Sequence, residues 1–549
     1  MGDGDNKTVG CGFKLSAWGA YGPSTSASDK LKGGGASIGG ERRYLDRTFF
    51  VDVSAELEER YAKLYEGIRQ AYDSYLFAIS IGRTNLSVDD GEDAKKKTSQ
   101  SSSTSEKVVA YEQQSHPGGD VDNLYIGSRS SLFAWRHFFG DKRENYIEPL
   151  LGLEVGTLYP FVDKDEIGEF PGSPLVIKFL FQLSLGFGSD TEKQIQDAPV
   201  TIFDSAYLYS KELLNYVQRY LQYKIYDRYG DPFTESNNLQ SKDGSQYLED
   251  VPGLYLGQTL MGGLGMSEFV ESCYMADASG SPDCKIVAGA RVVVGLVSII
   301  AGASANSDTS GGGNVLISGG VVDIMSAGRA FLATTTVDSH YQLIIHLLAG
   351  AAVELGGAAL GSSDVGVAGA QIMTSATWKP DQSRTRLVKE EKIIVRPYNG
   401  HVKGRGDASA SVAKRVELKN GVVLETEADS PILQGQNIGA RADNAAGGAT
   451  GYDNIDAQTV LRNSAGYKQR FMGDDDFSLD GVVAVHTMLV TGPGEPTAGV
   501  GASVAVEGDF EIAGVDVLVG ARALVEKPIG DDANISVGPE IGITWGGED

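Results

Sequence analysis

Glycine divides the middle of the chain into short apolar runs of similar length. The stretch NVLISGGVVDIMSAG at residues 314–328 holds two runs in which apolar side chains alternate with small or polar ones, each closed by glycine. Glycine recurs in this way at positions 289, 295, 302, 313, 319, 328, 350, 356, 361, 366 and 369. Short strands of Val, Ile and Ala between glycine turns suit either a barrel or a stacked β-structure. A β-solenoid or β-prism is the fold predicted for residues 281–378.

The distribution of aromatic residues decides between a barrel and a stacked β-structure. The chain has 47 aromatic residues, and only ten of them follow residue 280. A membrane barrel displays aromatic girdles on its hairpins, whereas stacked coils leave little room for rings. The scarcity of rings therefore favours the solenoid for this half.

The first half mixes predicted helices with predicted strands. After Ser54, a suitable N-cap, apolar residues recur at steps of four and three and predict an amphipathic helix; they are Leu57, Tyr61, Leu64, Ile68, Ala71 and Tyr75. A second heptad helix is expected after Asp204, and such seams also suit self-association. Alternation predicts strands at 124–135, 147–162 and 175–188.

The predicted fold class is therefore mainly β, with an α+β N-terminal part before the solenoid. The expected domains are an aromatic-rich α+β domain at 1–280 with a mobile loop at 89–107, the solenoid at 281–378, a charged insertion at 379–419 and an acidic β-rich region at 420–549. The insertion contains a predicted strand, KIIVRP, and Asn420-Gly421 predicts a hairpin turn.

The charge balance excludes one class of partner. With 47 basic and 73 acidic residues the net charge is −26, which repels phosphate backbones, so we expect no nucleic-acid binding. The last stretch, 474–549, holds fifteen acidic and two basic residues. Its simplest interpretation is a solvated face, and the alternative is a site for a cation or a basic partner.

No catalytic, cofactor or metal site is predicted. The six histidines are scattered: His116, His137, His340, His346, His401 and His486. If 339–346 were a strand, His340 and His346 would share a face and could bind a metal on a trimer axis, but the interpretation we favour is two half-buried strand histidines without a metal. Asp474–Asp476 and Asp480 offer oxygen ligands for calcium without matching a known loop spacing. Arg405-Gly406-Asp407 is interpreted as a chance tripeptide.

Three cysteines are too few for a disulfide framework. Cys273 and Cys284 flank a turn-rich decapeptide and could form one bridge, which the sequence leaves open; Cys11 is the third.

We expect neither a signal peptide nor a helical membrane span. The first residues, MGDGDNKTVGCGF, are polar and acidic. The most apolar window, 286–303, is interrupted by Arg291, Ser298 and glycines. Contact with a membrane by another route stays open.

The stretches at 312–338 and 347–370 resemble the needle of spike proteins from phage tails and contractile injection systems, the VgrG-like group. The resemblance covers about residues 285–378 and implies a homotrimer with an intertwined β-prism that pierces a membrane. It also implies partners among other structural proteins and a location in a virion or an extracellular injection apparatus. Whether 1–280 forms the hub module of such spikes is left open.

The expected function is accordingly that of a non-catalytic, trimeric spike or fibre component. One alternative is an outer-membrane β-barrel channel, which the alternating strands in both halves would suit. The other is a self-assembling lattice or shell protein whose exposed sheet edges pair between subunits.

Overall fold

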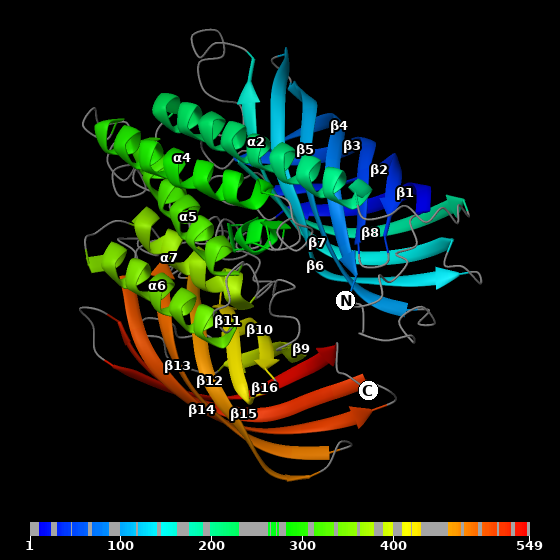
Figure 1. The fold of residues 1–549 in the computed structure, drawn as a ribbon. Helices are drawn as coiled ribbons and strands as arrows, with labels where there is room; N and C mark the ends of the chain where they lie inside the picture. Colours follow the sequence, from blue (N-terminus) through cyan, green and yellow to red (C-terminus); the bar gives the residue numbers. More distant parts are fainter. Residues whose placement is uncertain are drawn as a thin grey trace. The chain divides into compact units, whose positions relative to one another are not determined.

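The chain forms two compact units that each contain one closed barrel (Figure 1). One unit comprises residues 1–230 and 275–287, and the other comprises 231–274 and 288–549. The computed structural model describes residues 10–22, 30–44, 47–63, 69–86, 99–116, 119–139, 144–161, 175–189, 198–229, 262–263, 265–270, 272–273, 282–305, 312–333, 339–359, 363–377, 388–398, 409–418, 420–429, 459–473, 477–491, 497–512, 515–528 and 533–545.

The first unit is an antiparallel barrel in which every strand pairs with the next and β8 closes onto β1. Its strands are β1 (Gly10–Gly22), β2 (Lys30–Arg43), β3 (Arg47–Lys63), β4 (Arg69–Leu86), β5 (Ser99–His116), β6 (Gly119–Phe139), β7 (Asn145–Pro160) and β8 (Leu175–Ser189). Helix α2 (Ala198–Tyr229) follows the barrel. Residues 1–280, considered above as a hub module, thus begin with one closed barrel.

The second unit combines helices with a second closed antiparallel barrel. The helices are α4 (Asp283–Ala305), whose first residues up to Val287 belong to the first unit, α5 (Gly312–Ala333), α6 (Ser339–Ala359) and α7 (Ser363–Thr377). The strands are β9 (Val388–Tyr398), β10 (Ser409–Leu418), β11 (Val422–Asp429), β12 (Thr459–Gly473), β13 (Phe477–Thr491), β14 (Thr497–Ile512), β15 (Val515–Pro528) and β16 (Asn534–Trp545), and β16 closes onto β9.

The predicted solenoid at 281–378 is wrong, because its described residues are helical. Glycine marks helix contacts here and not strand turns. A Cβ added to Gly295 on α4 would lie 2.7 Å from the carbonyl oxygen of Gly320 on α5, and one on Gly302 would lie 2.3 Å from that of Gly313. Gly295 and Gly302 are seven residues apart on α4, as are Gly313 and Gly320 on α5. Seven residues are about two helical turns, so the two glycines of each helix share one face. They allow the two backbones to approach closely.

The helix predicted after Ser54 is also wrong, because its described residues lie on β3 and β4, two paired strands. Leu57 pairs with Tyr75 across the two strands, and both side chains point outward. Leu64 and Ile68 of the predicted helix lie outside the described residues. The second predicted helix is confirmed by α2, and the strands predicted at 124–135, 147–162 and 175–188 are confirmed by β6, β7 and β8.

The predicted loop and insertion both contribute strands. Residues 99–107 of the predicted mobile loop belong to β5, whereas 89–98 lie outside the described residues. All of β9 and all of β10 come from the predicted charged insertion, and they complete the second barrel. The Asn420-Gly421 turn is confirmed: it joins β10 to β11, and Gly421 has a φ of 84°, which favours glycine.

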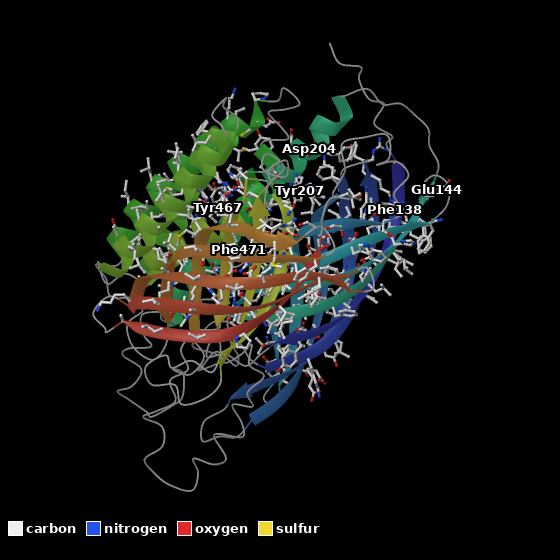
Figure 2. The ribbon with its side chains drawn as sticks, turned by 90° about the horizontal axis from the view of Figure 1, so that it is seen from below. Phe138, Glu144, Asp204, Tyr207, Tyr467 and Phe471 are labelled. Atoms are coloured by element: carbon white, nitrogen blue, oxygen red, sulfur yellow. The ribbon has the colours of Figure 1, made fainter. Side chains whose placement is uncertain are left out.

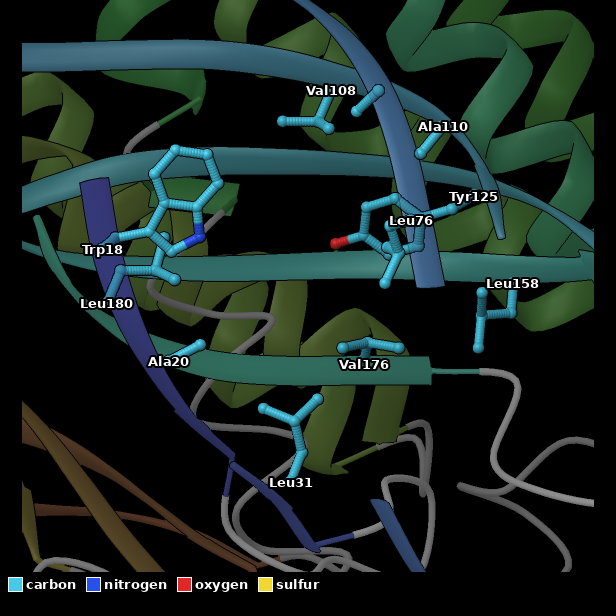
Figure 3. Close-up of a cluster of buried hydrophobic side chains, with 11 residues drawn as sticks. Trp18, Ala20, Leu31, Leu76, Val108, Ala110, Tyr125, Leu158, Val176 and Leu180 are labelled. Atoms are coloured by element: carbon cyan, nitrogen blue, oxygen red, sulfur yellow. The ribbon is translucent and has the colours of Figure 1, made fainter. Parts of the chain in front are cut away.

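The core of each unit lies inside its barrel. In the first barrel a cluster of inward side chains includes Trp18, Leu31, Leu76, Tyr125 and Leu180, all at most 6% exposed (Figure 3). In the second barrel Ile394, Ala413 and Leu518 are fully buried. Alternation along the strands produces this arrangement: from Lys14 to Gly22 on β1, the even-numbered side chains are buried and the odd-numbered ones exposed.

Candidate functional site: apolar outer walls around charged interiors

The outer wall of the first barrel is a continuous apolar surface. Five directly paired residues cross it from β8 to β4 and are 37–60% exposed; they are Leu185, Leu15, Ile38, Val53 and Ile79. A soluble barrel would place polar side chains at these positions. The row therefore indicates contact with an apolar solvent.

Aromatic side chains flank this apolar band at both ends of the barrel. At the end that holds Gly10 and Ser189, the exposed rings are Phe13, Phe133, Trp135, Phe139 and Phe187. At the opposite end they include Tyr21, Tyr75, Tyr111, Phe161 and Phe181. Phe13 and Tyr21 are about 26 Å apart along β1, and strand tilt reduces this to roughly 20 Å along the barrel axis. Two girdles around an apolar band of about 25 Å are typical of membrane barrels.

The second barrel has an apolar wall made of aliphatic residues. Val483, Val504, Ala523 and Val537 are paired in one row across β13 to β16, and all four are exposed. Its described rings gather at the end where β12 meets β13. There Tyr467 and Phe471 are 52% and 64% exposed (Figure 2), and Phe477 packs against Phe510 with ring centroids 5.2 Å apart.

Charged side chains fill the interior of the first barrel and neutralise one another. Lys178 Nζ lies 2.8 Å from Glu56, 2.8 Å from Glu58 and 3.2 Å from Glu154. Arg129 makes further ion pairs with Glu56 and Glu154, at 2.9 and 2.7 Å. All five side chains are at most 8% exposed. Such a network is stable only when each buried charge has a partner.

The second barrel repeats this arrangement with different residues. The Arg396 guanidinium is fully buried and contacts Glu425, Glu427 and Glu540 at 2.8, 3.0 and 2.9 Å. Arg415 shares Glu425 at 2.9 Å. Both barrel interiors are therefore polar and packed, while the walls are apolar.

Helix α2 covers one sector of the first barrel's outer wall with polar contacts. Arg47, which faces outward from β3, forms a buried ion pair with Asp204 at 2.8 Å. Phe49, also outward, packs against Tyr207 with ring centroids 5.8 Å apart, and the Tyr207 hydroxyl donates to the Ser105 carbonyl oxygen at 3.2 Å. Figure 2 labels Asp204 and Tyr207 on α2. This sector is consequently shielded from the surrounding solvent.

Replacing Tyr207 by phenylalanine should loosen α2 from the barrel by about 1 kcal/mol, because it leaves the buried Ser105 carbonyl without this donor. Hydrogen exchange of the α2 amides should then be several-fold faster. Tyr220→Phe is the matched control, since Tyr220 is 56% exposed on the same helix. Equal exchange in the two variants would show that the hydroxyl does not hold the helix.

Helices α6 and α7 cover a sector of the second barrel in the same way. Thr374 on α7 donates to the Asn463 side-chain oxygen on β12 at 3.3 Å. Thr487 on β13 donates to Glu354 on α6 at 3.0 Å. Leu347 packs on a buried cluster that includes Leu424 of β11. Each barrel thus has a free apolar sector and a sector paired with its own helices.

The three histidines whose side chains the structure describes, His137, His346 and His486, lie on different elements. His340 and His346 lie on helix α6 and not on a strand, which removes the geometry of the suggested metal ring. His346 is buried and lies 2.9 Å from the Ser375 hydroxyl. His137 lies 2.7 Å from the Ser99 hydroxyl, and His486 faces Glu526 inside the second barrel at 3.3 Å. The side chains of His116 and His340 and all of His401 lie outside what the structure describes.

The other singled-out residues form no shared site in the described part of the chain. Asp480 points into the second barrel and lies 3.1 Å from Lys468, whereas Asp474–Asp476 and Arg405–Asp407 lie outside the described residues. Among the described residues, no group of three or more His, Cys, Asp or Glu side chains is placed to hold a metal ion. Cys273 and Cys284 are both in a disulfide, and Cys11 is free and exposed.

Sequence reasoning missed the charged residues of the two interiors. A signal for them is present: in VVLETEAD on β11, Glu425 and Glu427 stand two residues apart, with Leu424, Thr426 and Ala428 at the intervening and flanking positions. The same spacing occurs for Glu56 and Glu58 on β3. Charges at every second residue of an otherwise apolar strand indicate a polar interior within an apolar wall.

Closed barrels with apolar walls and charged interiors define the class of membrane β-barrel proteins. No protein-family model matches the sequence, and no curated protein is significantly similar to it. Among solved structures, the Neisserial surface protein A is 10% identical over 32% of this chain and 96% of its own, with a TM-score of 0.22. The β-domain of the Bordetella autotransporter Brka is 6% identical over 98% of this chain and 99% of its own, with a TM-score of 0.17. CdiB from Escherichia coli is 7% identical over 97% of this chain and 63% of its own, with a TM-score of 0.18.

Likenesses at these TM-scores are weak, so we base the class on the barrels themselves. The barrels correct the expected function: the resemblance to VgrG-like spikes is wrong, because the stretch that carried it is helical. The expected homotrimer and the expected location in a virion or injection apparatus followed only from the resemblance to a spike needle, so no observation supports them now. The outer-membrane alternative agrees better with the fold.

Proposed function

We propose that this chain is an outer-membrane protein anchored in the bilayer by two small β-barrels whose interiors are filled. The observation that carries the proposal is the inverted polarity of both barrels, with Val53 and Val504 exposed on their walls and Lys178 and Arg396 buried in their interiors. A bilayer solvates such walls, whereas water would not. Spanning barrels of this kind occur in outer membranes.

The packed interiors favour an anchor over an open channel. An eight-stranded barrel is only wide enough for its own side chains to fill. In the first barrel, the apolar cluster around Trp18 and Tyr125 adds to the ion pairs around Lys178. In the second, Arg396 and its three carboxylates occupy the interior. The proposed role is therefore to hold the chain in the membrane, without catalysis and without free solute passage.

Flotation and conductance measurements test this proposal together. We expect the full-length chain, refolded into phosphatidylcholine vesicles, to float with them on a density gradient and to stay with them after an alkaline urea wash. In planar bilayers it should give no stepwise ionic conductance. A chain that stays at the bottom of the gradient would overturn membrane anchoring. A chain that floats and conducts in steps would replace the anchor with a channel.

A further inference from the structure

Helix α4 exposes an apolar face that barrel packing does not explain. Its segment Asp283–Ser304 is 22 residues long, and the most apolar window of that segment has a mean hydropathy of 2.2, with only 28% of the window buried. The exposed side chains include Val293, Leu296, Val297 and Ile300, which are 51–66% exposed. At about 1.5 Å per residue the segment is roughly 33 Å long, which matches a hydrocarbon core of about 30 Å.

The charged side chain in the middle of α4 is buried and has buried partners. From Ile286 to Ala305, Arg291 is the one charged residue, and it is 4% exposed. Its guanidinium hydrogen-bonds Ser326 on α5 and lies 3.7 Å from the ring centre of Phe269. Asp323, also on α5, is 3.9 Å away and 2% exposed. A soluble helical bundle would place these groups outside and the valines inside.

A second buried polar cluster joins α5, α6 and α7. Arg329 donates to the Ser375 hydroxyl at 2.7 Å, and His346 lies 2.9 Å from the same oxygen. All three residues are at most 7% exposed. Ionisable residues of membrane helices face the interior of a bundle and pair with one another, as these do.

The contacts between α4 and α5 are also those of membrane helices. Gly295 and Gly302 of α4 meet Gly320 and Gly313 of α5 at distances that leave no room for a Cβ. Helices surrounded by lipid associate through such close backbone contacts, because apolar side chains gain little by leaving lipid for each other.

We propose that α4 lies in the hydrocarbon core of a lipid bilayer, with its Val293–Ile300 face against acyl chains. The inference rests on the proposed membrane insertion of the second barrel. Helices α6 and α7 pack on the outer wall of that barrel, and α5 packs on α7, so an unbroken series of contacts leads from the wall to α4. The expectation of no helical membrane segment is thereby replaced for this helix.

Nitroxide accessibility in phosphatidylcholine vesicles tests the position of α4. The background is the full-length Cys11→Ser variant, which keeps the Cys273 and Cys284 disulfide, and single cysteines are labelled at 297 or 300. Val504→Cys on the wall of the second barrel is the lipid reference, and Asn420→Cys in the β10–β11 turn is the water reference. We expect labels at 297 and 300 to collide with oxygen more often than with a water-soluble nickel chelate, in the ratio found at 504.

The two references separate the possible failures. If 504 is lipid-exposed while 297 and 300 show the ratio found at 420, the helix lies in water and this inference is overturned, whereas barrel insertion stands. If 504 also shows the ratio found at 420, the barrel itself is not inserted and both proposals fail.

Discussion

Replacing Arg396 by methionine should lower the free energy of unfolding of the second barrel by about 3–5 kcal/mol. The guanidinium is fully buried and contacts three glutamates within 3.0 Å. Methionine fills similar space but leaves the carboxylates of Glu425, Glu427 and Glu540 with one positive charge fewer. Uncompensated charges cannot be solvated inside a closed barrel, so the cost exceeds that of a lost surface ion pair.

Urea unfolding of the chain in vesicles measures this effect, with tyrosine and tryptophan fluorescence as the signal. Arg470→Met is the matched control, because Arg470 lies 3.7 Å from Asp480 with 43% of its side chain exposed; its expected effect is below about 1 kcal/mol. Arg396→Lys should fall between the two variants, since it keeps the charge but loses the forked geometry. An Arg396→Met variant as stable as Arg470→Met would mean that the interior is wet and the network dispensable.

The local β-pattern could be predicted from the sequence, but closure could not. Alternation identified the strands later found as β6, β7 and β8, and Asn420-Gly421 identified a turn. Barrel closure depends on pairing between residues far apart, such as Leu15 with Leu185, which no local period records. The same limit explains the hairpin of β3 and β4, in which Leu57 and Tyr75 share an outer face although they lie on different strands.

The scarcity of aromatic residues after residue 280 wrongly predicted a solenoid, because the two halves of the chain were compared with a membrane barrel separately. The rings that precede residue 280 include the girdles of the first barrel, such as Phe13 and Tyr21. The second barrel needs fewer rings, since Val and Ile cover its wall. Glycine was ambiguous for a related reason: it permits both tight turns and close helix contacts, and Gly295 and Gly302 serve the second purpose.

Polarity, and not periodicity, distinguishes the environment of both kinds of element. On β3, Glu56 and Glu58 are buried while Leu57 is exposed, and on α4, Arg291 is buried while Val297 is exposed. On both elements a charged side chain is thus buried while a nearby aliphatic side chain is exposed. The proposed bilayer would favour this arrangement, and the period of the apolar residues alone does not reveal it.

A charged side chain placed on the apolar outer wall of the first barrel tests directly whether lipid surrounds this wall. Val53→Arg should destabilise the membrane-inserted first barrel by about 2–4 kcal/mol if the residue lies near the bilayer midplane. Val53 is 58% exposed and is flanked by its paired neighbours Ile38 and Ile79. No protein group is lost by the change, so the cost comes from placing a guanidinium in hydrocarbon.

The control for Val53→Arg is Asp73→Arg, an outward and exposed position near one end of β4. A charge there sits at the level of the lipid headgroups, and its expected effect is at most about 1 kcal/mol. Urea unfolding in vesicles compares the two variants at equal lipid content. In water an arginine on an exposed barrel wall would cost almost nothing, because the guanidinium would be hydrated at either position. Equal stabilities for the two variants would therefore contradict a lipid-facing wall, whereas a difference of about 2 kcal/mol or more would place Val53 in the hydrocarbon.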